Sequence, residues 1–111
     1  MKIYRIVPKV VWDEVVDEIP MAPIDEKDGY IHLSPHDQVL NTANLYFPPD
    51  TKPVVLCFED VVFGENLKWE GVESRGDVLF PHLYGKMLQR KDVCAVIALQ
   101  HNGKEYVGFE G

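Results

Sequence analysis

The chain has 111 residues, of which 46% are hydrophobic and 11% aromatic, and its formal net charge is −7. A chain of this length and composition can bury enough apolar surface to fold by itself, so we expect one globular domain over residues 1–111 and not a disordered segment. The acidic balance disfavours the extended basic face that nucleic-acid binding needs, so no nucleic acid is expected as a main partner.

The first expected elements are a strand and an amphipathic helix. Residues 2–7 alternate enough to form a strand. Beyond it, apolar side chains recur at intervals of three and four while acidic side chains fill the other face, which predicts a helix over residues 8–19. Pro20 and Pro23 end this helix, and residues 25–29 have the composition of a polar turn.

A second helix is expected after a short strand over residues 30–33. Ser34 suits the N-cap position of this helix, and Pro35 fits its first turn. The helix should end at Tyr46, just before two prolines. The first half of the chain therefore predicts two helices.

The second half of the chain is expected to be mostly β. A continuous apolar run over residues 54–58 predicts a buried central strand. Further strands are expected over residues 68–70, 79–83, 94–99 and 106–109. Asn102 and Gly103 suit a two-residue hairpin turn between the last two of these strands. Two early helices followed by strands indicate an α+β domain.

The segment Asp-Gly-Tyr-Ile-His-Leu-Ser, residues 28–34, places a histidine beside an aromatic residue in a short strand. Side chains alternate between the two faces of a strand, so His32 should share one face with Tyr30 and Ser34. The opposite face, with Ile31 and Leu33, should point into the core.

A second segment, Phe-Pro-His-Leu-Tyr-Gly over residues 80–85, resembles the first. His82 should share a face with Phe80 and Tyr84, although Pro81 limits this segment to an edge or irregular strand. If the two faces meet, they form a site of imidazoles, phenols and flat rings that suits a planar, polar small molecule. The alternative is that both histidines are hydrogen-bonded structural groups.

A charged loop leads into the second histidine segment and contains Glu70, Glu73 and Arg75. The forked guanidinium of an arginine suits an anion, and a glutamate suits the role of a base or an orienting group. A solvated charged loop is the alternative interpretation.

A metal site is not expected. His32 and His36 are four residues apart, but Ser34 and Pro35 break the helical register that would place both side chains on one face. The chain also lacks a phosphate-binding loop, a dinucleotide glycine fingerprint and a Gly-x-Ser-x-Gly elbow. The common nucleotide-binding folds are therefore not predicted.

The sequence predicts neither a membrane span nor a disulfide. No apolar run reaches the length of about 18 residues that a membrane span requires, and the first residues lack the apolar segment of a secretion signal. We therefore expect a cytoplasmic protein with no membrane contact. Cys57 and Cys94 each lie in an apolar, β-branched run, which predicts two reduced core thiols and no disulfide. The sequence leaves the oligomeric state open.

The motifs, taken in order, resemble one family. Ile-Tyr-Arg-Ile begins at residue 3, and Leu-Lys-Trp-Glu, Ser-Arg-Gly and Leu-Phe-Pro-His-Leu-Tyr-Gly follow in the second half of the chain. Together with the first histidine segment, they are similar to the domain-of-unknown-function 952 family (DUF952) over nearly the whole chain. The resemblance implies an α+β fold like that of the ADP-ribosyltransferases, in which small mixed sheets form a cleft that binds NAD. It implies no established activity.

The family pattern carries over to Arg5, His32, Ser34, Glu70, Ser74, Arg75, His82 and Tyr84. Gly71, Val72 and Glu73 separate Trp-Glu from Ser-Arg-Gly, where the family usually has fewer residues. Either Glu70 or Glu73 can therefore occupy the place of the family's glutamate.

We interpret Glu70, His32 and His82 as candidate catalytic residues. The candidate ligand-binding residues are Arg5, Tyr30, Ser34, Ser74, Arg75 and Tyr84. In the mechanism that the resemblance implies, Arg5, His32 and Arg75 hold the pyrophosphate of NAD and orient its ribose. Tyr84 would stack on the nicotinamide, and Glu70 would stabilise the positive charge that develops on the ribose.

Three functions stay open from the sequence. The first is ADP-ribosyl transfer or cleavage of the glycosidic bond of NAD, with NAD as substrate and no metal. The second is a non-catalytic module that binds a nucleotide or another small anion. The third is a protein-interaction domain whose aromatic face contacts a partner. The sequence does not decide whether the chain is an enzyme.

Overall fold

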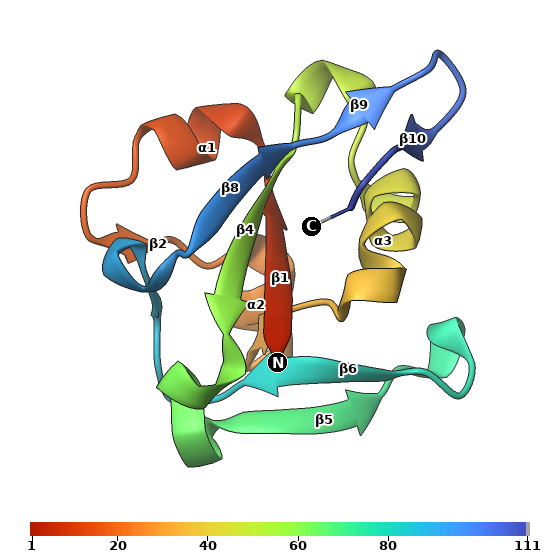
Figure 1. Cartoon of the computed structure of the whole chain (residues 1–111). Coiled ribbons are helices and arrows are strands. Elements are labelled where there is room, and N and C mark those ends of the chain that lie inside the picture. Colours follow the sequence, from red (N-terminus) through yellow and green to blue (C-terminus); the bar gives the residue numbers. More distant parts are fainter. Residues whose placement is uncertain (111) are drawn as a thin grey trace.

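A three-stranded antiparallel sheet forms the centre of the computed structural model, which describes residues 1–110 (Figure 1). Its middle strand is β4 (Val54–Glu59), and the strands β1 (Lys2–Val7) and β8 (Ala95–Ala98) flank it. The expectation of a buried central strand here is confirmed. In the pairing of β1 with β4, Lys2 lies opposite Glu59 and Val7 lies opposite Val54.

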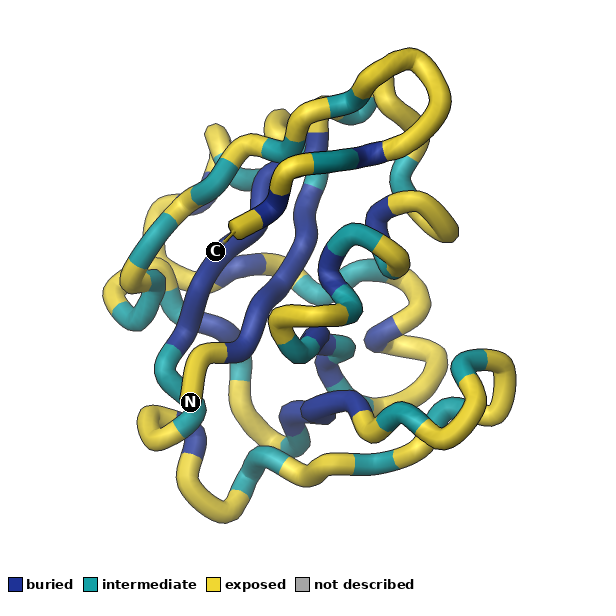
Figure 2. Tube along the Cα trace, turned by 45° about the vertical axis from the view of Figure 1, so that its right-hand side comes forward, coloured by how far each residue is buried: buried dark blue, intermediate teal, exposed yellow. Residues whose placement is uncertain are grey.

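Two hydrophobic clusters cover the two faces of β4. Val54, Leu56 and Phe58 belong to one cluster, and Val55 and Cys57 belong to the other. The alternation follows from the two-residue period of a strand. Helix α1 (Lys9–Asp13) packs on the first cluster and α3 (Val39–Tyr46) on the second, so these helices lie on opposite sides of the sheet (Figure 1). Buried residues accordingly run along the central strands, and exposed residues follow the loops (Figure 2).

A second three-stranded sheet has the order β3 (Ile31–His32), β6 (Leu79–Leu83) and β5 (Leu67–Gly71). The expectation that Pro81 confines its segment to an edge is wrong, because β6 is the middle strand. The N–H of Leu33 donates to the carbonyl of Pro81 at 3.1 Å, and proline has no N–H with which to return this bond. The hydrogen-bonded pairing of β3 with β6 ends next to Pro81, so the missing N–H of this proline does not interrupt it.

An isolated bridge joins the two large sheets at Tyr4 and Ser34, whose backbone groups exchange hydrogen bonds of 2.9 and 2.7 Å. Two smaller sheets complete the pairing. One pairs β2 (Glu18–Ile19) with β7 (Leu88–Gln89), and the other pairs β9 (Gln100–His101) with β10 (Tyr106–Val107).

The helix expected over residues 8–19 is wrong in its second half, because α1 covers only Lys9–Asp13. Valine is a weak helix former, and the like charges of Asp13 and Asp17 and of Glu14 and Glu18 fall four residues apart, where they destabilise a helix. The backbone of this stretch instead finds partners on another segment. The N–H of Arg90 donates to the carbonyl of Asp17, and its Nη1 donates to the carbonyl of Val15, both at 2.7 Å.

Helix α2 (Pro23–Asp28) occupies the place of the expected polar turn, so that expectation is also wrong. Pro23 begins the helix and does not break it, because proline fits the first helical turn. The carboxylate of Asp25 accepts the N–H of Ala22 at 2.7 Å, and Gly29 ends the helix with a φ of 81°.

The second expected helix is confirmed with a different start. A 3₁₀ turn over His36–Gln38 precedes α3 (Val39–Tyr46). Ser34 does not cap it, since its Oγ lies 3.3 Å from Oγ1 of Thr42. The remaining 3₁₀ segments are Pro49–Thr51, Asp60–Asn66, Glu73–Arg75 and Arg90–Asp92.

The C-terminal hairpin has a longer loop than expected. The N–H of Asn102 donates to the carbonyl of Glu105 at 3.1 Å, and the Asn102 side chain accepts the N–H groups of Lys104 and Glu105. The turn therefore covers four residues, from 102 to 105, and not two.

The α+β organisation is confirmed, with two corrections. Every strand pairing within residues 1–110 is antiparallel, so the expectation of mixed sheets is wrong. The first half also contains three α-helices, α1 to α3, where two were expected.

Both cysteines are free, but only Cys57 is buried while Cys94 is exposed, so the expectation of two core thiols is wrong for Cys94. No helix within residues 1–110 has the length and apolar character of a membrane span.

Candidate functional site

A buried ion pair links strand β1 to helix α2. Arg5 donates from Nη1 and Nη2 to the two carboxylate oxygens of Asp25, at 3.2 and 2.5 Å. Its Nη1 also donates to the carbonyl of His32 at 2.8 Å. Asp25 is 0% exposed and Arg5 is 6% exposed. Arg5 was expected to hold the pyrophosphate of NAD, but most of its donors are used inside the protein.

Asp25 collects further hydrogen bonds from strand β3. Its Oδ1 accepts the N–H of His32 at 3.0 Å and faces Nδ1 of the same residue at 2.7 Å. Burial by itself raises the pKa of the Asp25 carboxyl. The hydrogen bonds from His32 and Arg5, together with the guanidinium charge, outweigh burial and hold this pKa well below its usual range. Asp25 is therefore ionised and orients the His32 ring.

The other nitrogen of His32, Nε2, lies 2.9 Å from Oδ2 of Asp28. His32 therefore sits between two carboxylates, one fully buried and one 32% exposed. Neither Asp25 nor Asp28 was among the residues expected at the site. Their positions seven and four residues before His32, on a segment rich in acids, are the sequence signal that would have pointed to them.

A second histidine unit lies on strands β5 and β6. Nδ1 of His82 lies 2.8 Å from Oε1 of Glu70, and the hydroxyl of Tyr84 donates to the same oxygen at 2.5 Å. These two hydrogen bonds, with that from Tyr84 the stronger, lower the pKa of Glu70. The same contact raises the pKa of Tyr84 to about 12. Glu70, and not Glu73, is thus the glutamate that contacts a site histidine.

The two histidine units meet across an aromatic ring, as the facing of the two segments predicts. Tyr30 stacks on His82 with ring centroids 4.1 Å apart, and it lies 4.6 Å from the ring of His32 and 5.1 Å from that of Tyr84. The two imidazole rings are 5.6 Å apart. His32 and His82 lie opposite each other in the pairing of β3 with β6, which fixes this arrangement.

Arg75 reaches the same region from a 3₁₀ turn. Its Nη2 donates to Oε1 of Gln38 at 3.1 Å and to Oγ1 of Thr42 at 3.0 Å. Its guanidinium carbon lies 4.6 Å from the centroid of the Phe80 ring. Within residues 1–110 no carboxylate pairs with Arg75, so neutral groups hold its charge in place without neutralising it.

A cleft of about 720 Å³ connects these groups. Six of the nine candidate residues line it: Arg5, His32, Ser34, Ser74, Arg75 and His82. The other three, Tyr30, Glu70 and Tyr84, do not line the cleft but contact His82 directly or through Glu70. Asp28 is the carboxylate on the cleft lining. The nine residues that the sequence grouped therefore lie close together, and the structure divides them into those that line the cleft and those behind them.

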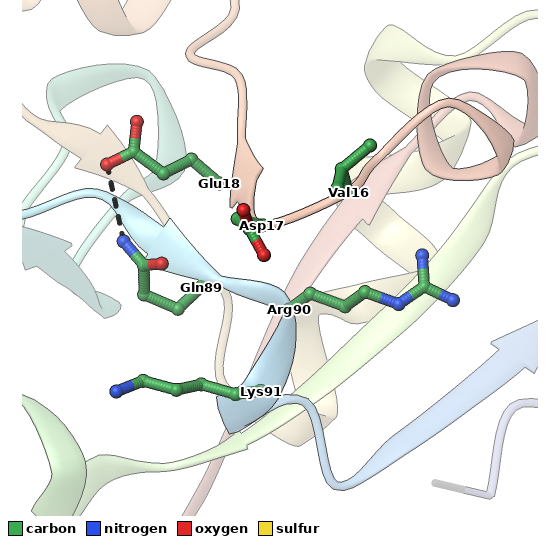
Figure 3. Close-up of a pocket in the computed structure, with 6 residues that line it drawn as sticks. All are labelled: Val16, Asp17, Glu18, Gln89, Arg90 and Lys91. Carbon is green, nitrogen blue, oxygen red and sulfur yellow. Dashed lines mark hydrogen bonds between the residues drawn. The ribbon is translucent and has the colours of Figure 1, made fainter.

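A second hollow has a different character. Val16, Asp17, Glu18, Gln89, Arg90 and Lys91 line it where β2 meets β7 (Figure 3). The Arg90 side chain extends away from the hydrogen bond between Glu18 and Gln89, and its guanidinium stacks 4.6 Å from the centroid of the Trp12 ring. None of the candidate residues lies here. Among the described residues, no group of three or more histidine, cysteine or acidic side chains is arranged to hold a metal ion.

Comparisons with known proteins agree with the fold. A family model described as a protein of unknown function (DUF952) matches residues 6–96. The crystal structure of CC0527 from Caulobacter crescentus is similar, with 32% identity over 96% of this chain and 92% of that chain and a TM-score of 0.84. Its solution NMR structure has 33% identity over 95% of this chain and 90% of that chain, with a TM-score of 0.78. No curated protein matches the sequence. None of these matches names an ADP-ribosyltransferase, so that likeness of fold stays a prediction.

Proposed function

We propose that this chain, which belongs to the DUF952 family, binds NAD or a related nucleotide in the cleft, with the pyrophosphate of the ligand on Arg75. The observation that carries the proposal is the Arg75 guanidinium on the cleft lining, with which no carboxylate of residues 1–110 pairs. Gln38 and Thr42 hold one nitrogen of Arg75 in place, and Phe80 supports the guanidinium. Bidentate recognition by an arginine fork suits the oxygens of a phosphate group.

The rest of the lining suits the other parts of a nucleotide. A volume of about 720 Å³ is in the range of cofactor sites. One part of the wall is apolar and contributes Val11, Met21, Ile24 and Phe47. This wall can cover a flat heterocycle, while the hydroxyls of Ser34, Thr42 and Ser74 can contact sugar or phosphate oxygens. The net charge of −7 makes general anion binding unfavourable, so the anion site is local.

Replacing Arg75 by glutamine is expected to weaken binding of NAD and of ADP-ribose on the order of 10- to 100-fold, because a charged hydrogen bond contributes about 1.5 to 3 kcal/mol. Isothermal titration measures both affinities. Arg90→Gln is the matched control, since Arg90 also lies 4.6 Å from an aromatic centroid but outside the cleft. Absence of binding at millimolar ligand, or equal losses in the two variants, would contradict the proposal.

The likeness to ADP-ribosyltransferases extends the proposal to chemistry. When the bond between nicotinamide and ribose breaks, its electron pair leaves with nicotinamide and positive charge develops on the ribose, which a nearby carboxylate stabilises. In the hydrolytic reaction water then adds to this ribose carbon and loses a proton, which gives ADP-ribose. Asp28 lies on the cleft lining and is positioned to serve this purpose. Glu70, whose pKa is lowered by its contacts with Tyr84 and His82, lies behind His82 and would act on the ribose through the His82 ring.

We expect the wild-type chain to release nicotinamide from NAD, and we expect Glu70→Gln to reduce this rate about 100-fold or more. Chromatography of the released nicotinamide measures the rate. Asp28→Asn is compared in parallel, and Glu73→Gln is the control, because Glu73 has no contact with either histidine. Binding of NAD without release would identify a non-catalytic module. A loss confined to Asp28→Asn would move the role from Glu70 to Asp28.

A further inference from the structure

His82 carries a buried polar atom that nothing in the described chain satisfies. The residue is 2% exposed, and its Nε2 has no hydrogen-bond partner within residues 1–110. Such atoms are rare because an unsatisfied buried polar group costs about 1 to 3 kcal/mol. His82 lines the cleft, so a bound ligand is the natural source of the missing partner.

The contacts of Nδ1 decide what kind of partner Nε2 needs. Nδ1 faces the Glu70 carboxylate at 2.8 Å, and an ionised carboxylate can only accept a hydrogen bond. Nδ1 must therefore carry a proton. Burial lowers the pKa of His82, and the Glu70 contacts offset this only in part. In the neutral ring that results, Nε2 is an acceptor with its lone pair free.

The groups around the ring hold this arrangement in place. Tyr30 stacks on it with an angle of 28° between the ring planes, and Tyr84 fixes Glu70 from behind. The other charged or titratable groups near it are His32, whose ring is edge-on at 5.6 Å, and Asp28, which holds Nε2 of His32. The His82 ring is therefore oriented from three sides before any ligand arrives.

We infer that Nε2 of His82 accepts a hydrogen bond from a hydroxyl group of the bound nucleotide, with Glu70 and Tyr84 as positioning residues that fix the ring. This inference rests on the proposed function, because it assigns a hydroxyl-bearing anion to the same cleft. It also gives Glu70, which contacts His82 but does not line the cleft, a role in binding. A ribose offers the hydroxyl donors that this acceptor needs, whereas sulfate, a tetrahedral oxyanion that can also contact Arg75, offers none at neutral pH.

The test combines the protonation pattern of the ring with ligand selectivity. Nitrogen-15 spectra of the imidazole are expected to place the proton of ligand-free His82 on Nδ1. On saturation with ADP-ribose the Nε2 signal should shift, and on saturation with sulfate it should not. Glu70→Ala removes the acceptor of Nδ1, so the proton should move to Nε2 and the affinity for ADP-ribose should fall about tenfold. The affinity for sulfate should stay unchanged.

Two further variants keep the test independent of folding. Glu70→Gln retains an oxygen that can accept from Nδ1, so it should restore the ring tautomer and most of the ADP-ribose affinity. Tyr84→Phe removes one hydrogen bond to Glu70 and should cause a smaller loss. The Tyr84 pKa of about 12 in the wild type should return towards its ordinary value in Glu70→Ala, as measured by ultraviolet titration.

The outcomes separate the inference from the proposed function. Failure of the wild type to bind either ADP-ribose or sulfate would overturn the proposed function and, with it, the role of His82. Binding of both ligands with an unmoved Nε2 signal and unchanged affinities in Glu70→Ala would overturn the inference alone. A proton on Nε2 in the ligand-free wild type would also overturn it.

Discussion

Asp25→Asn is expected to lower the free energy of unfolding by about 3 to 5 kcal/mol, because removing one partner of a buried ion pair leaves the other charge uncompensated. Asp25 is 0% exposed, and its two oxygens receive hydrogen bonds from Arg5, His32 and Ala22. An asparagine replaces one acceptor oxygen by an N–H donor that faces these donors. Urea denaturation monitored by tryptophan fluorescence measures the loss.

The matched control is Asp28→Asn. Asp28 contacts the same histidine at 2.9 Å, but its side chain is 32% exposed. An exposed pair of this kind contributes at most about 1 kcal/mol. Similar losses in the two variants would show that burial of the Asp25 carboxylate is not the reason for its contribution.

The same pair predicts a dependence of stability on pH. The folded-state pKa of Asp25 is lowered, so folding favours its ionised form. Its contribution is fully present above the ordinary pKa of about 3.9 and is lost as the pH falls below that value. The free energy of unfolding should therefore fall less steeply at acid pH in Asp25→Asn than in the wild type. Asp28→Asn should retain more of the steep fall that the wild type shows.

Local periodicity in the sequence predicted the central strand of the fold and the strands that carry the two histidines. The apolar run over residues 54–58 predicted β4, and the alternation around His32 and His82 predicted that these histidines share one region. These predictions succeeded because the two-residue period of a strand is set by each strand's own side chains. The two histidines of the candidate site lie where two such strands pair, so the sequence alone was enough to group them.

The failures come from contacts between distant segments. The segment after Asp13 leaves the helix because Arg90, more than 70 residues later, satisfies its carbonyls. Asp25 was interpreted as part of a solvated turn because its partner Arg5 is 20 residues away. Arg5, which was interpreted as a ligand contact, lines the cleft and also pairs with Asp25, a partner that the local sequence does not reveal. Charges of this kind pair through the tertiary fold, and no local pattern distinguishes a buried pair from two exposed groups.

Arg5→Met is expected to cost about 3 to 5 kcal/mol of stability, since it leaves the Asp25 carboxylate buried without a counter-charge on β1. The double variant Arg5→Met with Asp25→Leu removes both charges and should be less destabilised than either single variant. It should still lose about 1 to 3 kcal/mol, because His32 and Ala22 no longer have an acceptor for their N–H groups. Urea denaturation of the wild type, both single variants and the double variant gives the coupling free energy.

The double variant also tests why the pair is buried at all. Apolar replacements often stabilise a protein as well as a buried ion pair does, so stability alone does not explain Arg5 and Asp25. Asp25 contacts both the backbone N–H and the ring of His32, and Arg5 contacts the His32 carbonyl. We therefore expect the folded double variant to bind NAD about tenfold more weakly than the wild type, because the His32 ring is no longer oriented towards Asp28. Unchanged affinity, measured by titration of the folded variant, would show that the ion pair supports the fold and not the cleft.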